Sequence, residues 1–354
     1  MATAAPVPQK PVISVIIPAR NEEACLGACL QSLVTQAGMN FEIIVVNDGS
    51  CDRTPEIAQS FPAVTVVNAQ PLPQAWTGKN NALVSGAKIA RGEWLLFTDA
   101  DTVHLPGSLG RSLGEAQRRG TALLSYSPEQ EVRGFWEKAI MPVIFAELAS
   151  VYRPSEVSDT ASPVAAANGQ YLLVERDAYE AVGGHVAIAA TLLEDVALAR
   201  NVKNSGRRIF FRYGGDAVRA RMYRSFSQLR EGWTKNLALL FPAPIKLAVR
   251  RLREFGLIAA ATTAALISAF HGRPALAGAL ALALVILASL FVARIRKAHF
   301  PAQATALSFF GLPLFAYLLL RSSLSYRRGA VRWKGRNYSV PAPMAANGKT
   351  PRAA

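Results

Sequence analysis

Gly92-Glu-Trp-Leu-Leu-Phe-Thr-Asp-Ala-Asp101 decides the fold of this chain. The apolar run from Trp94 to Phe97 predicts a buried strand, and the strand ends in two acids one residue apart, Asp99 and Asp101. Acids at the C-terminal end of a strand lie where open α/β sheets bind ligands. Two carboxylates around one small residue can hold Mg²⁺ or Mn²⁺ and leave positions open for phosphate oxygens. The alternative is a solvated turn that caps the following helix.

The first 100 residues alternate between strand and helix patterns. The expected strands span 12–17, 41–46, 64–67 and 94–97, and the expected helices span 22–36 (capped by Asn21), 79–90 and a short segment from Thr54. This alternation predicts a parallel sheet with right-handed crossovers. Polar residues follow three of the strands, at 20–22, 47–48 and 99–101, so we expect them on one edge over a crevice.

Two common nucleotide-binding classes lack their motifs here. Residues 47–54 do not have the glycine pattern of dinucleotide folds, and Gly78-Lys79-Asn80 lacks the Ser or Thr of a phosphate-binding loop. The sequence therefore disfavours a hydride-transferring enzyme and a P-loop nucleotide hydrolase.

The net charge of +15 lies entirely in the last third of the chain. From residue 245 onward there are 16 Lys and Arg and one acid, Glu254, whereas the first 244 residues are neutral. The same third holds three uncharged runs, 255–270, 275–293 and 305–320. Basic clusters beside apolar runs of this length predict membrane-spanning helices and attraction to anionic lipid, and they disfavour a nucleic-acid reader.

The short loop His271-Gly272-Arg273 predicts that the first two runs form a hairpin. We expect the third run to be re-entrant or interfacial, because Gly311-Leu-Pro313 interrupts it and because a third span would put the basic tail outside. The first 11 residues have no apolar core, so no signal peptide is expected and the catalytic region should be cytosolic. Cys25, Cys29 and Cys51 fit a reducing compartment, and packing is a commoner role for the first two than metal binding.

Five motifs in this order resemble those of the family 2 glycosyltransferases, over roughly residues 12–240. They are Val15-Ile-Ile-Pro-Ala-Arg-Asn-Glu22, Val45-Val-Asn-Asp-Gly-Ser-Cys-Asp-Arg-Thr54, Gly78-Lys-Asn-Asn-Ala-Leu83, Phe97-Thr-Asp-Ala-Asp101 and Leu192-Leu-Glu-Asp-Val196. Two further stretches, Gln74-Ala-Trp76-Thr-Gly-Lys79 and Val331-Arg-Trp-Lys-Gly-Arg336, resemble a membrane branch associated with hopanoid and carotenoid glycosylation.

The resemblance implies a GT-A fold, an α/β nucleotide-sugar-binding domain with a mostly parallel sheet. It also implies transfer of a sugar with inversion, which needs a charge-neutralised diphosphate, a base and an aligned acceptor. The expected metal ligands for Mg²⁺ or Mn²⁺ are Asp99 and Asp101, and the expected base is Asp195, with Glu194 beside it. Helix capping is the alternative role for Asp195. The implied donor-site residues are Pro18, Glu22, Asp48, Lys79 and Asp99, and Trp76 is a further expected substrate-binding residue.

One motif departs from the polymerising relatives, which have an Arg directly before a Trp after the base. Here Gly232 precedes Trp233, with Arg230 and Lys235 nearby. A single-transfer enzyme is therefore expected rather than a processive synthase. Arg230 or Lys235 is expected to replace the missing charge, and Trp233 either stacks on the acceptor or anchors the chain at a membrane interface. The apolar stretch 135–152 is either core packing or an acceptor entrance.

The predicted organisation is a disordered N-terminus (1–11), a transferase domain (12–240), a basic interfacial helix (241–254), a transmembrane region (255–320) and a basic tail (321–354), disordered from 340. The predicted function is transfer of one sugar to a membrane lipid, such as a hopanoid, carotenoid or related isoprenoid, at the cytoplasmic face of the cell membrane. Two alternatives stay open: a polyprenyl-phosphate sugar transferase, and an inactive membrane scaffold or sugar-nucleotide sensor. No nucleic-acid partner is expected.

Overall fold

The computed structural model describes residues 10–338, so the predictions for residues 1–9 and for the end of the tail lie outside the described residues. The chain divides into two compact units. The first runs up to Glu131 and resumes from Tyr152 to Met222, and the second comprises Val132–Val151 and the chain from Tyr223 onward. The sequence placed the end of the first domain near residue 240 and did not foresee that residues 132–151 pack with the C-terminal helices.

A seven-stranded sheet forms the centre of the first unit. Its order is β3 (Val64–Asn68), β2 (Phe41–Asn47), β1 (Ile13–Ala19), β4 (Trp94–Phe97), β8 (Leu172–Glu175), β6 (Leu123–Ser127) and β9 (Ile209–Tyr213). The first four strands in this order are parallel, which confirms the predicted strands and places their polar C-terminal ends on one edge. The sheet is mixed rather than wholly parallel, because β8 is antiparallel to β4 and β6.

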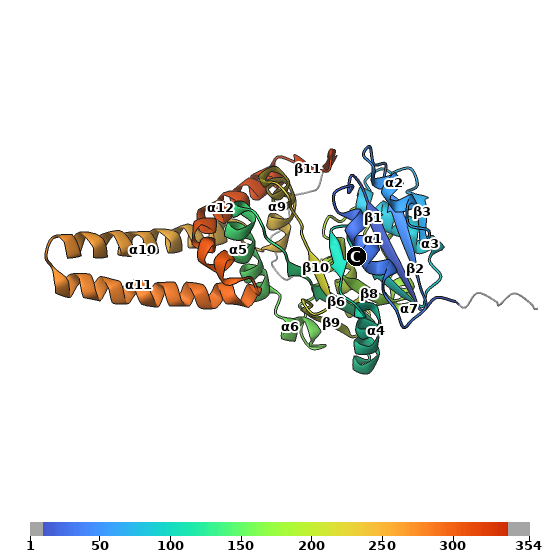
Figure 1. The fold of residues 1–354 in the computed structure, drawn as a ribbon, viewed down its shortest axis with the longest axis horizontal. Coiled ribbons are helices and arrows are strands. Elements are labelled where there is room, and N and C mark those ends of the chain that lie inside the picture. Colours follow the sequence, from blue (N-terminus) through green and yellow to red (C-terminus); the bar gives the residue numbers. More distant parts are fainter. Residues whose placement is uncertain (1–9, 339–354) are drawn as a thin grey trace, which may run out of the picture. The chain divides into compact units, whose positions relative to one another are not determined.

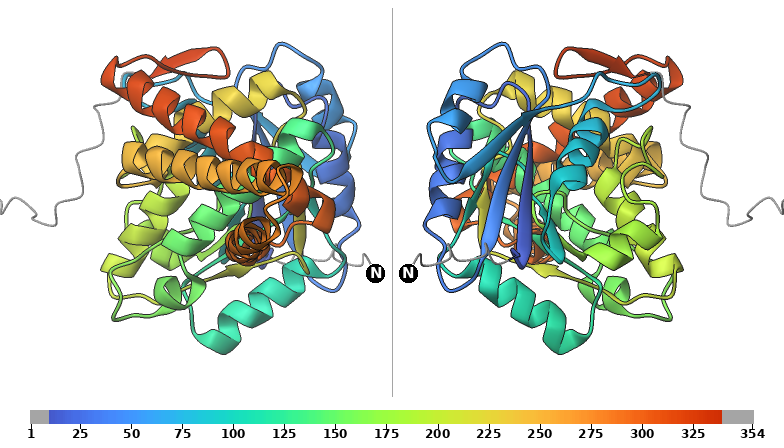
Figure 2. Two further views of the ribbon diagram at one scale, coloured as in Figure 1. Left: turned by 90° about the vertical axis from the view of Figure 1, so that its left-hand side faces the viewer. Right: turned by 90° about the vertical axis from the view of Figure 1, so that its right-hand side faces the viewer.

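Helices cover both faces of this sheet (Figure 2). The buried apolar residues of this unit form two hydrophobic cores. The first core includes residues of α1 (Leu26–Val34), α2 (Thr54–Gln59) and α4 (Ser108–Arg119). The second core includes residues of α3 (Gly78–Ile89), α7 (Arg176–Ala181) and α8 (Glu194–Asn204). Val15 and Ile17 belong to the first core and Ile16 to the second, as the two-residue period of a strand requires. A second sheet of β5 (Thr102–His104), β10 (Val218–Ala220) and β7 (Glu129–Gln130) completes the unit, with the short helix α6 (Pro154–Ser158) against β9.

The first helix begins later than the sequence predicted, at Leu26 rather than at Glu22. Asn21 does not cap it, because its backbone is left-handed, with φ of 53°. The N–H groups of Glu22 and Glu23 instead donate to Thr54 Oγ1 (2.8 Å) and to Asp52 Oδ2 (3.1 Å). These bonds tie the loop after β1 to the loop after β2, so the residues that looked like a first helical turn join two strand ends.

The second unit is mainly helical. It contains α5 (Phe135–Val151), α9 (Phe226–Leu240), α10 (Pro244–Phe270), α11 (Pro274–Ile295), a 3-10 turn (Arg296–Ala298), α12 (Ala302–Arg327) and a hairpin of β11 (Val331–Trp333) and β12 (Arg336–Tyr338). Helices α10 and α11 form the long hairpin drawn in Figure 1, and α10 joins the expected interfacial segment and the first apolar run in one helix.

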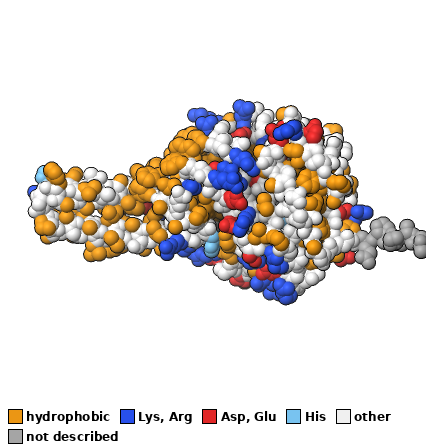
Figure 3. Space-filling model, viewed as in Figure 1, with side chains coloured by type: hydrophobic (Ala, Val, Ile, Leu, Met, Phe, Trp, Pro, Cys, Tyr) orange, Lys and Arg blue, Asp and Glu red, His pale blue; other side chains and the backbone are white. Residues whose placement is uncertain are grey.

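Three helices of this unit, α10, α11 with the 3-10 turn, and α12, are long and apolar enough to cross a membrane, judged by length and composition. Hydrophobic side chains cover the outside of the α10–α11 hairpin (Figure 3). Only 11% of the apolar window of α10 and 6% of that of α11 is buried within the protein, against 50% for α12. The hairpin therefore presents apolar surface that a bilayer would cover, whereas α12 is half covered by its own unit.

The third apolar run is a continuous helix, because Gly311 and Pro313 lie inside α12 without ending it. A Cβ atom at Gly311 would lie 1.9 Å from the carbonyl oxygen of Ala139 in α5. The glycine therefore allows the backbones of α5 and α12 to touch, as small residues do where helices pack closely.

A cluster of buried charges joins α5 to the start of the hairpin. Glu147 of α5, with 4% of its side chain exposed, lies 3.0 Å from Nε of Arg251 and 3.6 Å from Nε of Arg294. Glu254 contacts both of these arginines as well. Buried charges are tolerated where they are paired, so this cluster fixes the junction of three helices.

Candidate active site

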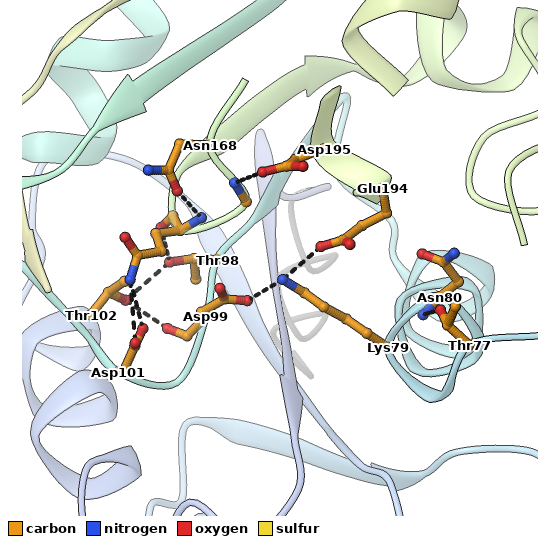
Figure 4. Close-up of polar contacts among 12 residues, drawn as sticks. Thr77, Lys79, Asn80, Thr98, Asp99, Asp101, Thr102, Asn168, Glu194 and Asp195 are labelled. Carbon is orange, nitrogen blue, oxygen red and sulfur yellow. Dashed lines mark hydrogen bonds and ion pairs between the residues drawn. The ribbon is translucent and has the colours of Figure 1, made fainter. Parts of the chain in front are cut away.

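The acidic turn after β4 is held by two threonine hydroxyls beneath it. Thr98 Oγ1 donates to the carbonyl oxygen of Gln170 (2.7 Å), and Thr102 Oγ1 donates to the carbonyl oxygen of Asp99 (2.7 Å). Both threonines are buried, with 1% of their surface exposed. Asp99 and Asp101 thus project from a turn whose backbone is fixed by the core of the first unit (Figure 4).

Asp101 is oriented by a glutamine that the sequence did not single out. The side-chain amide of Gln170 donates to both carboxylate oxygens of Asp101, each at 3.2 Å. Gln130 in turn donates to Oε1 of Gln170 (3.0 Å), and both glutamines are buried. A carboxylate held in this way keeps one orientation before any ligand arrives.

Lys79 connects the acidic turn to Glu194, the residue beside the expected base. It lies in the first turn of α3, which Thr77 caps by accepting from the N–H of Asn80. Its Nζ atom is 2.7 Å from Asp99 Oδ1 and 2.7 Å from Glu194 Oε1 (Figure 4). Burial disfavours the charged amine, but the two carboxylates outweigh it and hold the pKa of Lys79 well above its usual value.

Asn80 fastens the start of α3 to the segment that leads into α8. Its buried Nδ2 group donates to the carbonyl oxygens of Ile188 (2.9 Å), Ala189 (3.0 Å) and Thr191 (3.0 Å). The segment 188–191 precedes Glu194 by a few residues. Asn80 therefore fixes the distance between Lys79 and Glu194, and the sequence signal for it was the Gly78-Lys-Asn-Asn motif.

Glu194 and Asp195 are the first residues of α8. The cap position is Leu193, so Asp195 is not the N-cap that the alternative reading proposed. Asp195 Oδ2 accepts from the N–H of Gly169 (2.9 Å), and Oδ1 accepts from the N–H of Val196 (2.8 Å). Burial and the neighbouring charge of Glu194 outweigh these bonds and Lys79, and they raise the pKa of Asp195 to about 6. Such a carboxylate can accept a proton near neutral pH.

These groups line one small cavity. Its walls include Lys79, Asp99, Glu194 and Asp195, with Gly169 and His185 between them. A Cβ atom at Gly169 would lie 3.2 Å from Lys79 Nζ and 3.4 Å from Glu194 Oε1, so glycine leaves the room that these side chains need. The structure therefore brings together four of the residues that the sequence selected.

The residues expected at the nucleoside lie on the same edge of the sheet. Pro18 is in β1 opposite Val46 of β2, and the N–H of Asp48 donates to the carbonyl oxygen of Ala19 (2.8 Å). Glu22 follows β1, and Asp48 follows β2 with 8% of its surface exposed. Trp76 is half-buried just before α3. Their contact with a nucleotide stays a prediction.

Arg230 and Trp233 belong to α9, in the second unit. Trp233 is 2% exposed, and its ring lies 6.1 Å from that of Phe145 and 6.0 Å from that of Tyr223. A Cβ atom at Gly232 would lie 2.4 Å from the Tyr223 hydroxyl. The ring of Tyr223 therefore leaves no room for a side chain at position 232.

The donor atoms at the acidic turn fit a hard divalent cation. Carboxylate oxygens are the ligands that Mg²⁺ and Mn²⁺ prefer, and a cation of this kind is often held by one or two carboxylates together with substrate phosphates. Among residues 10–338 no group of three or more His, Cys, Asp or Glu side chains could hold a metal alone. Asp99 and Asp101 thus fit a cation that arrives with a diphosphate.

Comparison with known families decides the class of this domain. Residues 14–183 match the family model described as glycosyl transferase family 2. These residues form a family 2 glycosyltransferase domain. The match begins in β1 and ends after α7, so it contains the acidic turn and Lys79.

Two relatives extend the comparison beyond this domain. The 4,4'-diaponeurosporenoate glycosyltransferase of Staphylococcus aureus (strain USA300) is 29% identical over 336 residues, covering 93% of this chain and 88% of the relative. A solved structure, the mannosyltransferase PcManGT from Pyrobaculum calidifontis in complex with GDP-Man and Mn²⁺, aligns with a TM-score of 0.54 at 19% identity, covering 90% of this chain and 87% of that one. The second similarity supports the GT-A fold.

Proposed function

We propose that this family 2 glycosyltransferase is an inverting enzyme that moves a single sugar from a nucleotide-sugar donor to a membrane lipid. The observation that carries the proposal is the position of Lys79 Nζ, 2.7 Å from both Asp99 and Glu194. One ammonium group thereby links the acidic turn, where a diphosphate would lie, to Glu194, the residue beside the expected base Asp195. The similarity to a 4,4'-diaponeurosporenoate glycosyltransferase supports a hopanoid, carotenoid or related isoprenoid acceptor.

The reaction needs one proton transfer and one displacement. When the acceptor is a hydroxyl, Asp195 accepts its proton while the acceptor oxygen bonds to the anomeric carbon, and the bond from that carbon to the diphosphate breaks on the opposite face; a carboxylate acceptor is already ionised and needs no such transfer. The hydrogen bonds from Gly169 and Val196 hold the Asp195 carboxylate toward the cavity. Lys79 offers positive charge beside both reacting partners, and it stays protonated because its pKa is raised.

Asp99 and Asp101 would hold Mg²⁺ or Mn²⁺, which when bound neutralises the charge of the leaving diphosphate. The presence of Mn²⁺ with GDP-Man in the mannosyltransferase structure supports this assignment. The chain fixes the backbone of Asp99 in advance through Thr102, and it fixes the carboxylate of Asp101 through Gln170. Pro18, Glu22 and Asp48 are proposed to bind the nucleoside, and Trp76 is proposed to contact the substrate.

We also propose that α10 and α11 cross the membrane as a hairpin, with the first unit in the cytosol. Arg250 and Arg253 near the start of α10, and Arg296 and Lys297 after α11, would then lie at the cytosolic side, as the positive-inside rule requires. Only the short loop 271–273 would emerge on the far side.

We propose that α12 lies at the cytosolic interface and does not cross. Lys138 of α5 donates to Gln303 near the start of α12 (2.9 Å), and Tyr326 near its end donates to the carbonyl oxygen of Lys235 in α9 (2.7 Å). The chain enters α5 from the first unit and returns to it, and α9 leads from the first unit to the basic start of α10. A helix that packs on α5 and α9 would lie on the same side of the membrane as these two helices.

The full-length protein should be expressed in cells that lack it, and their lipids should be compared by mass spectrometry with and without the protein. Gain of one hexose-sized mass on an isoprenoid lipid is the expected result. Purified protein with Mn²⁺ and a panel of UDP- and GDP-sugars should reproduce the transfer. Absence of any metal-dependent donor turnover would instead indicate a scaffold or sensor.

A further inference from the structure

Gly183-Gly184-His185 forms a tight turn after α7 that no step above uses. Both glycines have left-handed backbones, with φ of 73° and 51°. A Cβ atom at Gly184 would lie 2.4 Å from the ring of Tyr179, so only glycine allows the turn to fold back onto that ring. The turn places His185 in the wall of the cavity that also contains Lys79, Asp99 and Asp195.

The imidazole ring of His185 is fixed in position. It is 1% exposed and meets the ring of Phe97 edge-on, with centroids 4.7 Å apart. Its Nδ1 atom is 3.1 Å from the hydroxyl of Tyr179, and its backbone N–H donates to the same hydroxyl at 3.1 Å. Phe97 is the last residue of β4, so the ring is anchored beside the acidic turn.

These contacts determine which nitrogen carries the proton. The Tyr179 oxygen already accepts a hydrogen bond from the backbone N–H of His185, and only 7% of the Tyr179 surface is exposed. If Nδ1 also donated to this oxygen, the phenol proton would have no acceptor in the described part of the chain, at a cost of about 1–3 kcal/mol. The phenol therefore donates to Nδ1, and a neutral ring then carries its proton on Nε2. Burial lowers the pKa of His185 to about 4, which keeps the ring neutral.

The Nε2–H group has no protein partner among residues 10–338. The charged groups in the cavity wall are three carboxylates, from Asp99, Glu194 and Asp195, and one ammonium, from Lys79. This set is net negative and repels a bare anion, but it suits a hydroxyl group, which can donate to a carboxylate and accept from an N–H. A sugar presents several such hydroxyls.

We propose that His185 is a specificity-determining residue for the donor sugar: its Nε2–H donates a hydrogen bond to a hydroxyl oxygen of the sugar that is transferred. The inference rests on the proposed function, because the small cavity between Asp99 and Asp195 would then receive one hydroxyl group of the sugar. Gly183, Gly184 and Tyr179 act through His185, since they set its position and its tautomer.

The test compares two affinities in the full-length protein in detergent. The dissociation constants of a nucleoside diphosphate and of the corresponding nucleotide sugar are measured by calorimetry with Mn²⁺, for UDP- and GDP-linked hexoses. Their ratio isolates the contribution of the sugar. His185→Asn keeps a polar group near Tyr179 but does not reach the Nε2 position, whereas His185→Gln can place an N–H there.

In His185→Asn we expect the gain in affinity from the sugar to fall by about 5–10-fold, with the affinity for the diphosphate unchanged, and we expect His185→Gln to restore part of it. One monodeoxy donor should lose affinity in the wild type and not in His185→Asn. An unchanged ratio in His185→Asn, or an equal loss for diphosphate and sugar nucleotide, overturns the role of His185. A wild-type protein that binds no nucleotide sugar overturns the proposed function itself.

Discussion

The backbone N–H of Gly169 donates to Asp195 Oδ2 over 2.9 Å, so the expected base faces the cavity before any substrate is present. Asp195→Asn should lower kcat by about 10²–10⁴-fold with little change in the affinity for the nucleotide sugar. Initial rates and calorimetry measure the two quantities separately. Turnover within a few-fold of wild type would remove Asp195 from this role and would favour an acceptor that is already ionised, such as a polyprenyl phosphate.

The pH dependence of the reaction should report the same carboxylate. Burial and Glu194 raise the pKa of Asp195 to about 6, and a base works only when it is deprotonated. The value of kcat/KM should therefore rise with pH through about 6 and level off above it. A profile that stays flat down to pH 4.5 contradicts the assignment, because the carboxylate would then titrate below the range of the assay.

Lys79→Met should shift that profile. The positive charge of Lys79 lowers the pKa of Asp195, so its removal should move the acid limb of kcat/KM to higher pH and weaken binding of the donor. Lys79→Arg keeps the charge and is the matched control, with the acid limb expected near its wild-type position. Equal shifts in both variants would show that geometry, and not charge, sets the profile.

Gln170→Leu should weaken the metal site while leaving its ligands in place. The variant removes both hydrogen bonds to Asp101, and loss of such an orienting partner lowers metal affinity by about 10–100-fold. Paramagnetic resonance of free Mn²⁺, titrated in the presence of a nucleoside diphosphate, measures the change. Gln130→Leu removes only the partner of Gln170 and should have a smaller effect; an Mn²⁺ affinity unaffected by Gln170→Leu contradicts the prediction.

Glu147→Gln should destabilise the second unit, because it leaves the buried Arg251 and Arg294 with Glu254 alone. Removing one partner of a buried ion pair costs about 3–5 kcal/mol. Glu129→Gln is the control, since Glu129 and Arg219 form a pair with side chains 41% and 47% exposed, and such pairs contribute about 0–1 kcal/mol. Thermal unfolding in detergent should show a much larger shift for Glu147→Gln, and equal shifts would argue against the buried cluster as a clamp.

The position of the C-terminal end tests the proposed interfacial helix. A reporter active only in the cytosol should be active when fused after Arg336 and silent when inserted at Gly272, because only the loop 271–273 is expected to emerge. A reporter after Arg336 that works solely in the external compartment would show that α12 crosses the membrane as a third span.

Much of the fold of the first unit could be predicted from local sequence patterns, namely apolar runs and the polar motifs that follow them. Strand β4 has the bounds that its apolar run indicated, and the polar ends of β1, β2 and β4 share an edge because parallel strands point the same way. Lys79, Asp99, Glu194 and Asp195 meet in one cavity, although they come from distant parts of the chain. The motifs carried this information because each one marks the end of a strand or the start of a helix.

The remaining features depend on contacts that no local pattern encodes. Nothing near Gln170 indicates that its amide reaches Asp101, 69 residues earlier. Asn is a residue type that often caps helices, but the backbone N–H of Asn21 instead donates to the hydroxyl of Ser50, in the loop after β2. The run 170–174 predicts a strand without a direction, so the antiparallel position of β8 could not be foreseen.

Residues 132–151 belong to the second unit although they lie between two parts of the first unit in the sequence, and this matters for the preparation of a soluble fragment. Cutting the chain after Met222 would remove α9 and α12 and leave α5 without the helices that bury Ile140, Val143 and Ile144. The truncated protein should precipitate because the apolar face of α5 is exposed, even though the transferase sheet is intact. A water-soluble version needs a second edit, in which a short polar linker joins Glu131 to Tyr152.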